Sequence, residues 1–388
     1  MTRLLIAASL ALCLFGQSGE VLEQADEAFR QGNLDRAERL ARQALALDAN
    51  AIHGHMILGV VAAQKKQWDA SNRHFESVVR LEPANPFGYF YLGQAKLFEQ
   101  QWGQAIRYFS KALELGYPER ERLVIELATA QHEAGQSIQA LSTLGMIGPP
   151  ADQRLAAQYH AILAFSKSRL SQSAAAIEAM RKAVQLDAVS AHYWEFLIGE
   201  LMKTDQTQQA LSEAIRAQRI FPDNPEIQFL FALASYYVSE SPLTALALRN
   251  LREAEPDSAR VQLAEGLVCR KQGKTQEAIQ AFRRAAGRGL PDAHLLLGIV
   301  YRENGDFDAA GQEYRKAEQL NPRNGQVLLE MGKLLVARGE LEQARIRLEK
   351  AAEYMPDAPA VHYQLGILYR RLGELDKAQE QLRLVRQP

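Results

Sequence analysis

The chain lacks most of the residue patterns that catalytic and metal-binding sites require. Its 388 residues include only two cysteines, Cys13 and Cys269, which excludes a disulfide framework and a cysteine-rich metal site. The sequence has no G-x-S-x-G, P-loop, G-x-G-x-x-G or H-E-x-x-H motif. We therefore expect a protein that is not an enzyme and that carries neither a metal nor another cofactor.

An excess of charge of one sign is also missing. Lysine and arginine number 45, aspartate and glutamate number 46, and the formal net charge is −1. A protein that holds nucleic acid usually presents a basic field to the phosphates, and this chain has none overall. We therefore expect no nucleic-acid partner.

The chain has no apolar run long enough to cross a bilayer as a helix. Its first eighteen residues nevertheless differ from the rest, because Arg3 precedes an unbroken run of apolar and small residues over 4–15. About a dozen residues fall short of the ~20 that a membrane-spanning helix needs. A basic start, a short apolar run and small residues after it are typical of a secretory signal. We expect residues 1–18 to be a signal peptide.

Cleavage of this segment is expected after Gly16 or Ser18, and cleavage after Ser18 would leave a mature chain of residues 19–388. Such a chain would be exported and would be periplasmic or secreted. Two alternatives keep the protein at a membrane: the segment stays uncleaved as an anchor, or Cys13 is lipidated. If Cys13 is removed, Cys269 is the single remaining thiol, which suits an oxidising compartment.

What the chain does contain is a unit of 34 residues that repeats from about residue 18 to the C-terminus. Small residues, mostly glycine and alanine, hold the eighth and twentieth places of nearly every repeat. A chain that repeats one such unit has no single closed core, and stacking of the units creates a long surface. The repeats begin near residues 18, 52, 86, 121, 157, 191, 225, 259, 291, 325 and 359.

Each repeat has the pattern of two helices joined by a turn. In the repeat at 325–358, Val327, Leu328 and Met331 begin a helical spacing of apolar residues. Gly339 suits the turn that follows, and Pro356 ends the second helix. The small places allow the two helices to approach closely, and we expect the large residues at the twenty-fourth place to fill the space that remains.

These repeats resemble tetratricopeptide repeats, and the resemblance covers residues 18–388. It implies an all-α fold, a right-handed superhelical solenoid of about eleven repeats. It further implies binding of proteins or peptides by first helices that line a concave groove. Places of the family pattern are held in the sixth repeat by Trp194, Leu197, Ala210, Ala217 and Pro222.

Two departures from a regular array are visible. The fourth repeat ends early and two extra residues precede the fifth, so 148–156 is either a hinge or a longer loop. The last repeat stops at Pro388 with no polar helix after it, although solenoid ends usually carry a polar cap. Its leucines are then free for self-association or for a partner.

The resemblance places the groove at the second, fifth, ninth, twelfth and thirteenth residues of each repeat. It predicts a surface that is aromatic toward the N-terminus and has a basic rim toward the C-terminus. Inter-repeat packing of the aromatic residues and a merely solvated rim are the alternatives. The predicted groove residues are Met56, Phe87, Phe90, Leu97, Phe98, Phe229, Tyr236, Tyr237, Arg270, Lys271, Arg302 and Arg370.

The histidines at the fourth place are expected to pack rather than to bind metal. Four repeats have a histidine there, where the family often has tryptophan or tyrosine. They are His55, His160, His294 and His362.

These observations predict a non-enzymatic scaffold or adaptor of the cell envelope that binds peptide or helical segments of partner proteins in its groove. Two alternatives stay open. The first is a structural protein that self-assembles through its C-terminal repeat. The second is a non-catalytic subunit of an envelope enzyme complex, or of a secretion or polysaccharide complex.

Overall fold

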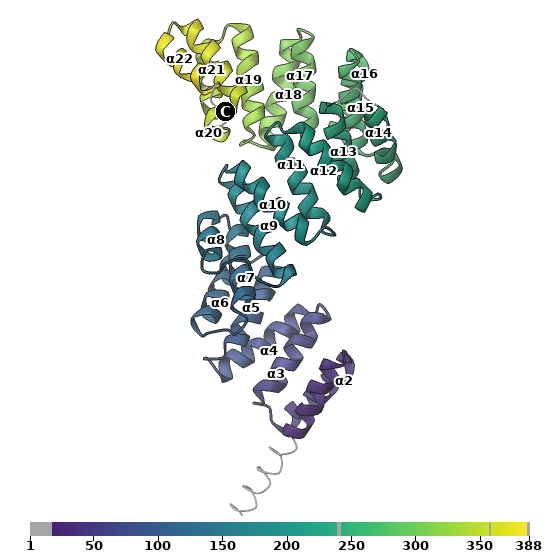
Figure 1. Ribbon diagram of the computed structural model, residues 1–388, viewed down its shortest axis with the longest axis vertical. Coiled ribbons are helices and arrows are strands. Elements are labelled where there is room, and N and C mark those ends of the chain that lie inside the picture. Colours follow the sequence, from purple (N-terminus) through teal and green to yellow (C-terminus); the bar gives the residue numbers. More distant parts are fainter. Residues whose placement is uncertain (1–17, 239–241, 357, 386–388) are drawn as a thin grey trace, which may run out of the picture. The chain divides into compact units, whose positions relative to one another are not determined.

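The computed structural model describes residues 18–238, 242–356 and 358–385, and every regular element within these ranges is an α-helix (Figure 1). The all-α helical repeat is therefore confirmed. Most of the predicted signal peptide, Cys13 included, and residues 239–241 of the seventh repeat's turn lie outside the described residues. Within the described ranges, no helix is both long enough and apolar enough to cross a membrane.

The described residues divide into two compact units, which meet between Ala188 and Val189. This boundary does not coincide with the hinge predicted at 148–156. In the N-terminal unit, residues 18–30 are helical. The helices that follow are α2 (Leu34–Leu47), α3 (Ile52–Gln64), α4 (Trp68–Leu81), α5 (Pro86–Phe98), α6 (Trp102–Glu114), α7 (Arg120–Glu133), α8 (Ser137–Leu144), α9 (Gln153–Arg169) and α10 (Ser173–Leu186).

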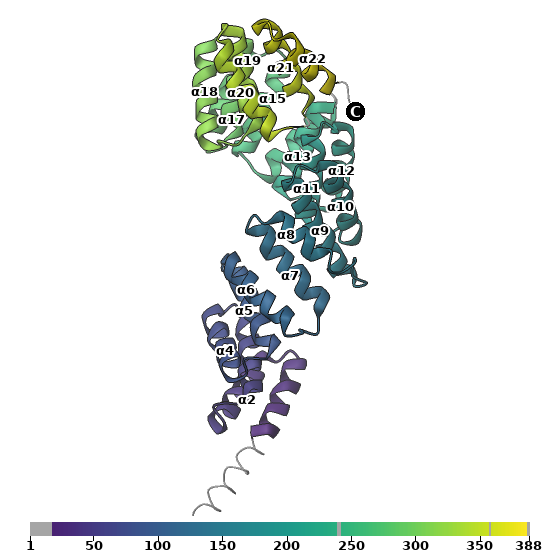
Figure 2. The ribbon, with the colours of Figure 1, turned by 90° about the vertical axis from the view of Figure 1, so that its left-hand side faces the viewer.

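The C-terminal unit continues the same alternation, so odd-numbered helices are the first and even-numbered helices the second of each repeat. Figure 2 shows neighbouring pairs of this unit, α17 with α18 and α19 with α20, side by side. Its helices are α11 (Ala191–Lys203), α12 (Thr207–Ile220), α13 (Pro225–Val238), α14 (Pro242–Ala254), α15 (Ala259–Lys271), α16 (Thr275–Gly287), α17 (Asp292–Glu303), α18 (Phe307–Leu320), α19 (Gly325–Arg338), α20 (Leu341–Tyr354), α21 (Pro359–Leu372) and α22 (Leu375–Leu384).

Inside a repeat, the glycine at the eighth place receives the large side chain of the twenty-fourth. A Cβ atom added at Gly298 would lie 2.3 Å from Cε1 of Tyr314, and one at Gly93 would lie 2.6 Å from Cδ1 of Phe109. No side chain fits such a gap, so the helices meet on the bare backbone. The packing role predicted for these places is confirmed. The same contact is made by Gly59 with Phe75, Gly266 with Phe282, Gly332 with Leu348 and Gly366 with Leu382.

In several repeats a larger residue at the eighth place is accompanied by a smaller one at the twenty-fourth. Where the eighth residue is larger than glycine, the twenty-fourth is never aromatic, because both side chains share the space of one helix crossing. These residues are buried on both sides of the crossing. Such pairs include Ala128 with Leu144, Ala164 with Met180 and Ile198 with Ala214.

Two of the fourth-place histidines, His55 and His362, join the second helix of their repeat to the preceding loop, whereas Nδ1 of His160 has no hydrogen-bond partner within the described ranges. His362 contacts Oε1 of Gln381 through Nδ1 at 2.8 Å and the Pro356 carbonyl through Nε2 at 2.6 Å. His294 pairs with the Glu313 carboxylate of its own repeat at 2.6 Å. These contacts support the packing role. Within the described ranges, no three histidine, cysteine, aspartate or glutamate side chains come together as metal ligands.

Candidate functional site

The exposed aromatic side chains of the described residues all lie on first helices. They are Phe98 on α5, Tyr237 on α13 and Tyr363 on α21, with exposed fractions of 60%, 54% and 50%. The exposed large aliphatic side chains, such as Ile138 and Ile346, lie instead on second helices or in loops. In each unit the exposed aromatic surface thus lies on the first helices, which the sequence predicted for binding. We call Phe98 of the N-terminal unit and Tyr237 and Tyr363 of the C-terminal unit the aromatic face.

Two of these aromatic side chains are held in place by a neighbouring ring. Phe98 stacks on Trp68, with ring centroids 4.2 Å apart and planes inclined by 28°. Tyr237 meets Tyr236 edge to face at 5.1 Å. A supported ring loses little side-chain entropy when a partner covers it, which favours its use as an anchor.

Phe90 corrects the sequence prediction, because its side chain is 0% exposed. Tyr117, which follows α6, stacks on it at a centroid distance of 4.3 Å, and the guanidinium of Arg122 lies 5.2 Å from its ring centroid. The fifth place of this repeat is therefore core, and Phe90 cannot contact a partner. The half-buried groove residues pack beside such cores: they are Met56, Phe87, Leu97, Phe229 and Tyr236.

Part of the predicted basic rim is neutralised within the chain. Arg270 forms a two-pronged ion pair with Glu303, with nitrogen–oxygen distances of 2.5 and 2.9 Å, which holds the pKa of Glu303 below its usual value. Arg302 reaches the buried Glu330 at 3.2 Å. These pairs join α15 to α17 and α17 to α19, and of the predicted rim residues only Arg370 and Lys271 are exposed.

Lys271 has a structural role that recurs in other repeats. Its ammonium donates to the carbonyl oxygen of Tyr236 at 3.0 Å, so the thirteenth residue of one repeat reaches the twelfth of the repeat before it. Arg371 donates to the Val336 carbonyl in the same way, at 2.8 Å. The last carbonyls of a helix lack the regular partner four residues on, and these cations donate to them; the Val336 carbonyl also accepts from the Gly339 amide at 3.2 Å. Lys271 thus links α15 to α13 through this hydrogen bond.

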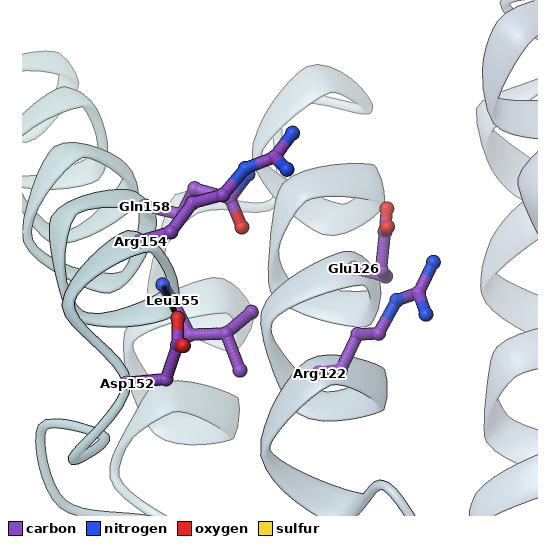
Figure 3. A pocket seen from close by; sticks show the side chains of 6 residues that line it. All are labelled: Arg122, Glu126, Asp152, Arg154, Leu155 and Gln158. Atoms are coloured by element: carbon purple, nitrogen blue, oxygen red, sulfur yellow. Dashed lines mark hydrogen bonds between the residues drawn. The ribbon is translucent and has the colours of Figure 1, made fainter.

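A cleft of 370 Å³ lies between α7 and α9 in the N-terminal unit (Figure 3). Arg122 and Glu126 lie on α7, and the other lining residues lie on the neighbouring segment at the start of α9 (Figure 3). Burial raises the pKa of Glu126, which accepts a hydrogen bond from Gln94 at 3.2 Å. Groups of both signs therefore face this cleft. Its lining residues are Arg122, Glu126, Asp152, Arg154, Leu155 and Gln158.

A second cleft, of 260 Å³, lies in the C-terminal unit where α17 and α19 begin and α18 ends. We call it the α17–α19 cleft. It is mainly apolar, and its one ionisable lining residue is Asp292. Its lining residues are Pro291, Asp292, Leu295, Ala317, Leu320, Asn321, Asn324 and Val327.

Sequence reasoning missed Tyr363, Glu126 and Asp292. Tyr363 is at the fifth place and Asp292 at the second, two of the places that the family resemblance marks, so a signal for both was present. Glu126 is at the sixth place, which the resemblance does not mark. Its position in a cleft follows from the extra turn at the start of α9, which brings Asp152 and Arg154 opposite it.

Comparison with known families identifies the repeat. Models of the tetratricopeptide repeat match residues 22–86, 235–292, 270–325 and 329–387, and a second model of the same description matches 301–353. Together these matches cover more than half of the chain.

The curated relatives include two proteins that share a description. The BBSome complex member bbs-4 of Caenorhabditis elegans is 23% identical over 287 residues, which are 61% of this chain and 60% of that protein. The BBSome complex member BBS4 of Bos taurus is 32% identical over 112 residues, 28% of this chain and 21% of that protein. The chain therefore spans less than two thirds of each of these relatives.

Solved structures with a similar arrangement include the APC/C hetero-tetramer Cut9–Hcn1 and yeast Tom70. The first is 17% identical with a TM-score of 0.44, over 87% of this chain and 80% of that one. The second is 13% identical with a TM-score of 0.43, over 95% of this chain and 84% of that one.

Proposed function

Because the chain belongs to the tetratricopeptide repeat family, we propose that it is a non-enzymatic scaffold that binds segments of partner proteins on its first helices. The family fold is typical of protein–protein interaction, and stacked helix pairs offer an extended surface. The segments would be peptides or single helices, since these fit a face built from parallel rows of helices.

The observation that carries this proposal is the aromatic face. Exposed phenylalanine and tyrosine at rigid helical positions are the side chains that most often dominate interface energetics. A soluble helix that needed only to fold would place polar residues at such sites. The concentration of Phe98, Tyr237 and Tyr363 on first helices therefore supports a binding role for that face.

The proposal extends to membership of a multi-protein assembly. The curated relatives are described as members of a complex, the BBSome. Their partial overlap with this chain supports a scaffold role of the same general kind, without carrying over their particular partners.

Replacement of Phe98 and Tyr237 by glutamate together should release the partners while leaving the fold intact. Each change puts a charge where an apolar ring would be covered, and loss of hot-spot rings typically weakens binding by more than about thirtyfold. The measurement is a crosslinking pull-down of the full chain from its native cells, with partners quantified by mass spectrometry. Circular dichroism would confirm that helix content is unchanged.

The matched control is Ile138→Glu with Ile346→Glu. These residues are 69% and 65% exposed but lie on the second helices α8 and α20. We expect the control to retain the partners. Equal retention by both double variants, or equal loss, would move the binding surface away from the aromatic face.

Self-assembly is a second candidate function, favoured by two exposed leucines on α22. Leu375 and Leu384 of the last repeat both remain exposed. A second copy could cover them. Light scattering of the purified chain separates the two functions, because a monomer at high concentration excludes self-assembly through α22.

The proposal also places this scaffold outside the cytoplasm, on the strength of the basic start and short apolar run of residues 1–18. N-terminal sequencing of the protein from its native cells should find a chain that begins after Gly16 or Ser18. A lipid on Cys13, or an intact Met1 on protein recovered with the membranes, would instead support a membrane anchor, and an intact Met1 on protein free of membranes would contradict export.

A further inference from the structure

His55 and His74 of the second repeat contact each other through their ring nitrogens. The two Nδ1 atoms lie 3.0 Å apart, and the ring centroids lie 5.3 Å apart with planes inclined by 45°. His55 belongs to α3 and His74 to α4, and these two helices pack against each other. Two imidazole nitrogens, one from each helix, are thus held side by side.

Among the residues that the structure describes, only this fourth-place histidine lies opposite a second histidine. The twenty-third residue of the same repeat is Glu313 opposite His294 and Gln381 opposite His362. Glutamate or glutamine therefore serves the packing contact in those repeats. In the second repeat the chain has a nitrogen there instead, and neutral imidazole is the commonest metal ligand in proteins.

The contact that His55 makes with the preceding loop determines its tautomer. Its Nε2 lies 3.2 Å from the carbonyl oxygen of Ala49. A carbonyl oxygen only accepts, so Nε2 carries the proton and Nδ1 presents a lone pair to His74. A backbone carbonyl on the far nitrogen is a usual outer partner of a metal-binding histidine. His55 therefore already has the tautomer and the support that a ligand needs.

The separation of the two Nδ1 atoms suits one geometry of metal coordination. With metal–nitrogen bonds of about 2.0–2.1 Å, adjacent nitrogens lie about 2.9 Å apart around a square-planar ion and about 3.3 Å apart around a tetrahedral one. The observed 3.0 Å is nearer to the square-planar value. Nitrogen and oxygen ligands in this geometry are typical of Cu²⁺ and Ni²⁺, and Cu²⁺ binds them more tightly.

The charges around His74 are mixed. Burial, and after it the charges of His55, Arg42 and Arg73, lowers the pKa of this ring to about 4, and the Glu38 carboxylate acts in the opposite direction. The ring is thus neutral at pH 7.5, the form that binds metal ions. Arg42 is paired with Glu38 at 2.6 Å, and Arg73 is exposed, so that water and salt screen its charge. Both histidines are half-buried, which leaves part of each ring accessible to water.

We propose that Nδ1 of His55 and Nδ1 of His74 bind one Cu²⁺ ion, with water in its remaining positions. The ion takes the place of the proton between the two nitrogens, and that proton moves to Nε2 of His74. The loop before α3, α3 itself and α4 are then joined through one ion. The sequence predicted only packing for the fourth-place histidines, and His55 would combine both roles. This site needs no partner segment.

Calorimetric titration of the metal-free full chain, without an affinity tag and with its thiols blocked, tests the site. At pH 7.5 the wild type should bind one Cu²⁺ ion per chain. His55→Gln and His74→Gln should each raise Kd at least about tenfold, because each removes a ligand where even the loss of an outer partner weakens binding by that factor. Glutamine keeps the packing contact that Gln381 makes in the last repeat.

The matched control is His294→Gln, which makes the same change at the fourth place of another repeat. It should bind Cu²⁺ as the wild type does. Electron paramagnetic resonance identifies the ligands, since the bound ion should show splitting from two imidazole nitrogens in the wild type and from one in His74→Gln. Circular dichroism checks that every variant is folded.

A second site can be built from the same two places of the last repeat. Gln381→His puts an imidazole opposite His362, whose Nε2 contacts the Pro356 carbonyl at 2.6 Å. We expect this variant to bind two Cu²⁺ ions per chain. Binding of a single ion would count against the proposal, because histidines at these two places would then not suffice for a site.

Hydrogen exchange locates the bound ion. A ligand that binds only the folded state stabilises it, so Cu²⁺ should slow exchange of the α3 and α4 amides in the wild type but not in His74→Gln. Equal Cu²⁺ affinity of the wild type and of the double variant His55→Gln and His74→Gln would overturn the inference. Neither result bears on the scaffold function, which the variants of the aromatic face test separately.

Discussion

Gly298→Ala is expected to destabilise the C-terminal unit by about 3 kcal/mol, at the upper end of the cost of overpacking a core. The added Cβ would lie 2.3 Å from Cε1 and 2.4 Å from Cδ1 of Tyr314. Tyr314 is fully buried, so its ring has nowhere to move. Urea denaturation followed by circular dichroism measures the loss, and hydrogen exchange of the α17 and α18 amides locates it.

The control is Gly199→Ala on α11, where nothing lies within 4 Å of the added atom. There the usual preference of helices for alanine should stabilise the protein by about 1 kcal/mol. The same glycine-to-alanine change should thus lower the free energy of unfolding at Gly298 and raise it at Gly199. A stabilising Gly298→Ala would show that the eighth place does not set the helix crossing.

A second change should rescue the first. Repeat five pairs Ala164 with Met180 at the same two places. Tyr314→Met should therefore recover much of the stability lost in Gly298→Ala, although it costs stability in the wild type. If the losses of stability from Gly298→Ala and Tyr314→Met simply add in the double variant, the two places do not compensate for each other's volume.

The stability of the N-terminal unit is expected to fall by about 3 kcal/mol between pH 6.5 and pH 4 because of His132. Burial, and secondarily the charge of Arg169, lowers the pKa of this histidine from 6.5 to about 4. Its Nδ1 lies 3.1 Å from the Ser166 hydroxyl, and the side chain is 7% exposed. The unfolded chain binds a proton below pH 6.5 that the folded chain does not bind until about pH 4.

The measurement compares the wild type with His132→Gln by hydrogen exchange of the α7 and α9 amides at pH 7.5 and pH 5. Exchange rates are corrected for the intrinsic effect of pH. Burial also lowers the pKa of His74 to about 4, so only the difference between the two proteins isolates His132. The variant should lose less protection at low pH. Equal losses in both proteins would contradict the assignment.

Residues that act within one repeat could be predicted from the sequence. The eighth place shows this well: glycine at Gly298 and Gly332 recurs with a large residue sixteen positions later, and a column that repeats is visible in a single chain. The two helices and the turn at Gly339, which has a φ of 80°, followed from the same local pattern.

Residues whose environment depends on the neighbouring repeat could not be predicted in the same way. Phe90 and Phe98 lie on one helix and both occupy places that the family assigns to the groove. Phe90 is buried because Tyr117 stacks on it, whereas the ring of Phe98 rests on Trp68 with one side open. Tyr117 lies in the closing loop of Phe90's own repeat, Arg122 of the next repeat also reaches the Phe90 ring, and Trp68 belongs to the repeat before. Which place is covered therefore depends on residues outside the helix that carries it.

The environment of the charged groove residues could not be predicted from the sequence either. Counting Arg270 and Arg302 gave a basic rim, but each finds a carboxylate about thirty residues away on the next first helix.

The ion pairs between neighbouring repeats differ from place to place along the chain, so they fix the order of the repeats. The packing inside each repeat is alike throughout and does not fix that order. Removal of residues 291–324, one whole repeat, would leave the contacts of the remaining eighth-place glycines intact, since each of these lies within a repeat. It would place α15 beside α19, where Arg270 takes the twelfth place that Arg302 held opposite Glu330. Arg338 and Arg347 would lose Asp308 and Glu318, however, and the matching places of the repeat before hold Gln276 and Ala286. A chain with a duplicated or deleted repeat would keep the packing within each repeat but lose ion pairs between neighbouring repeats. The repeats are alike in construction but not interchangeable in position.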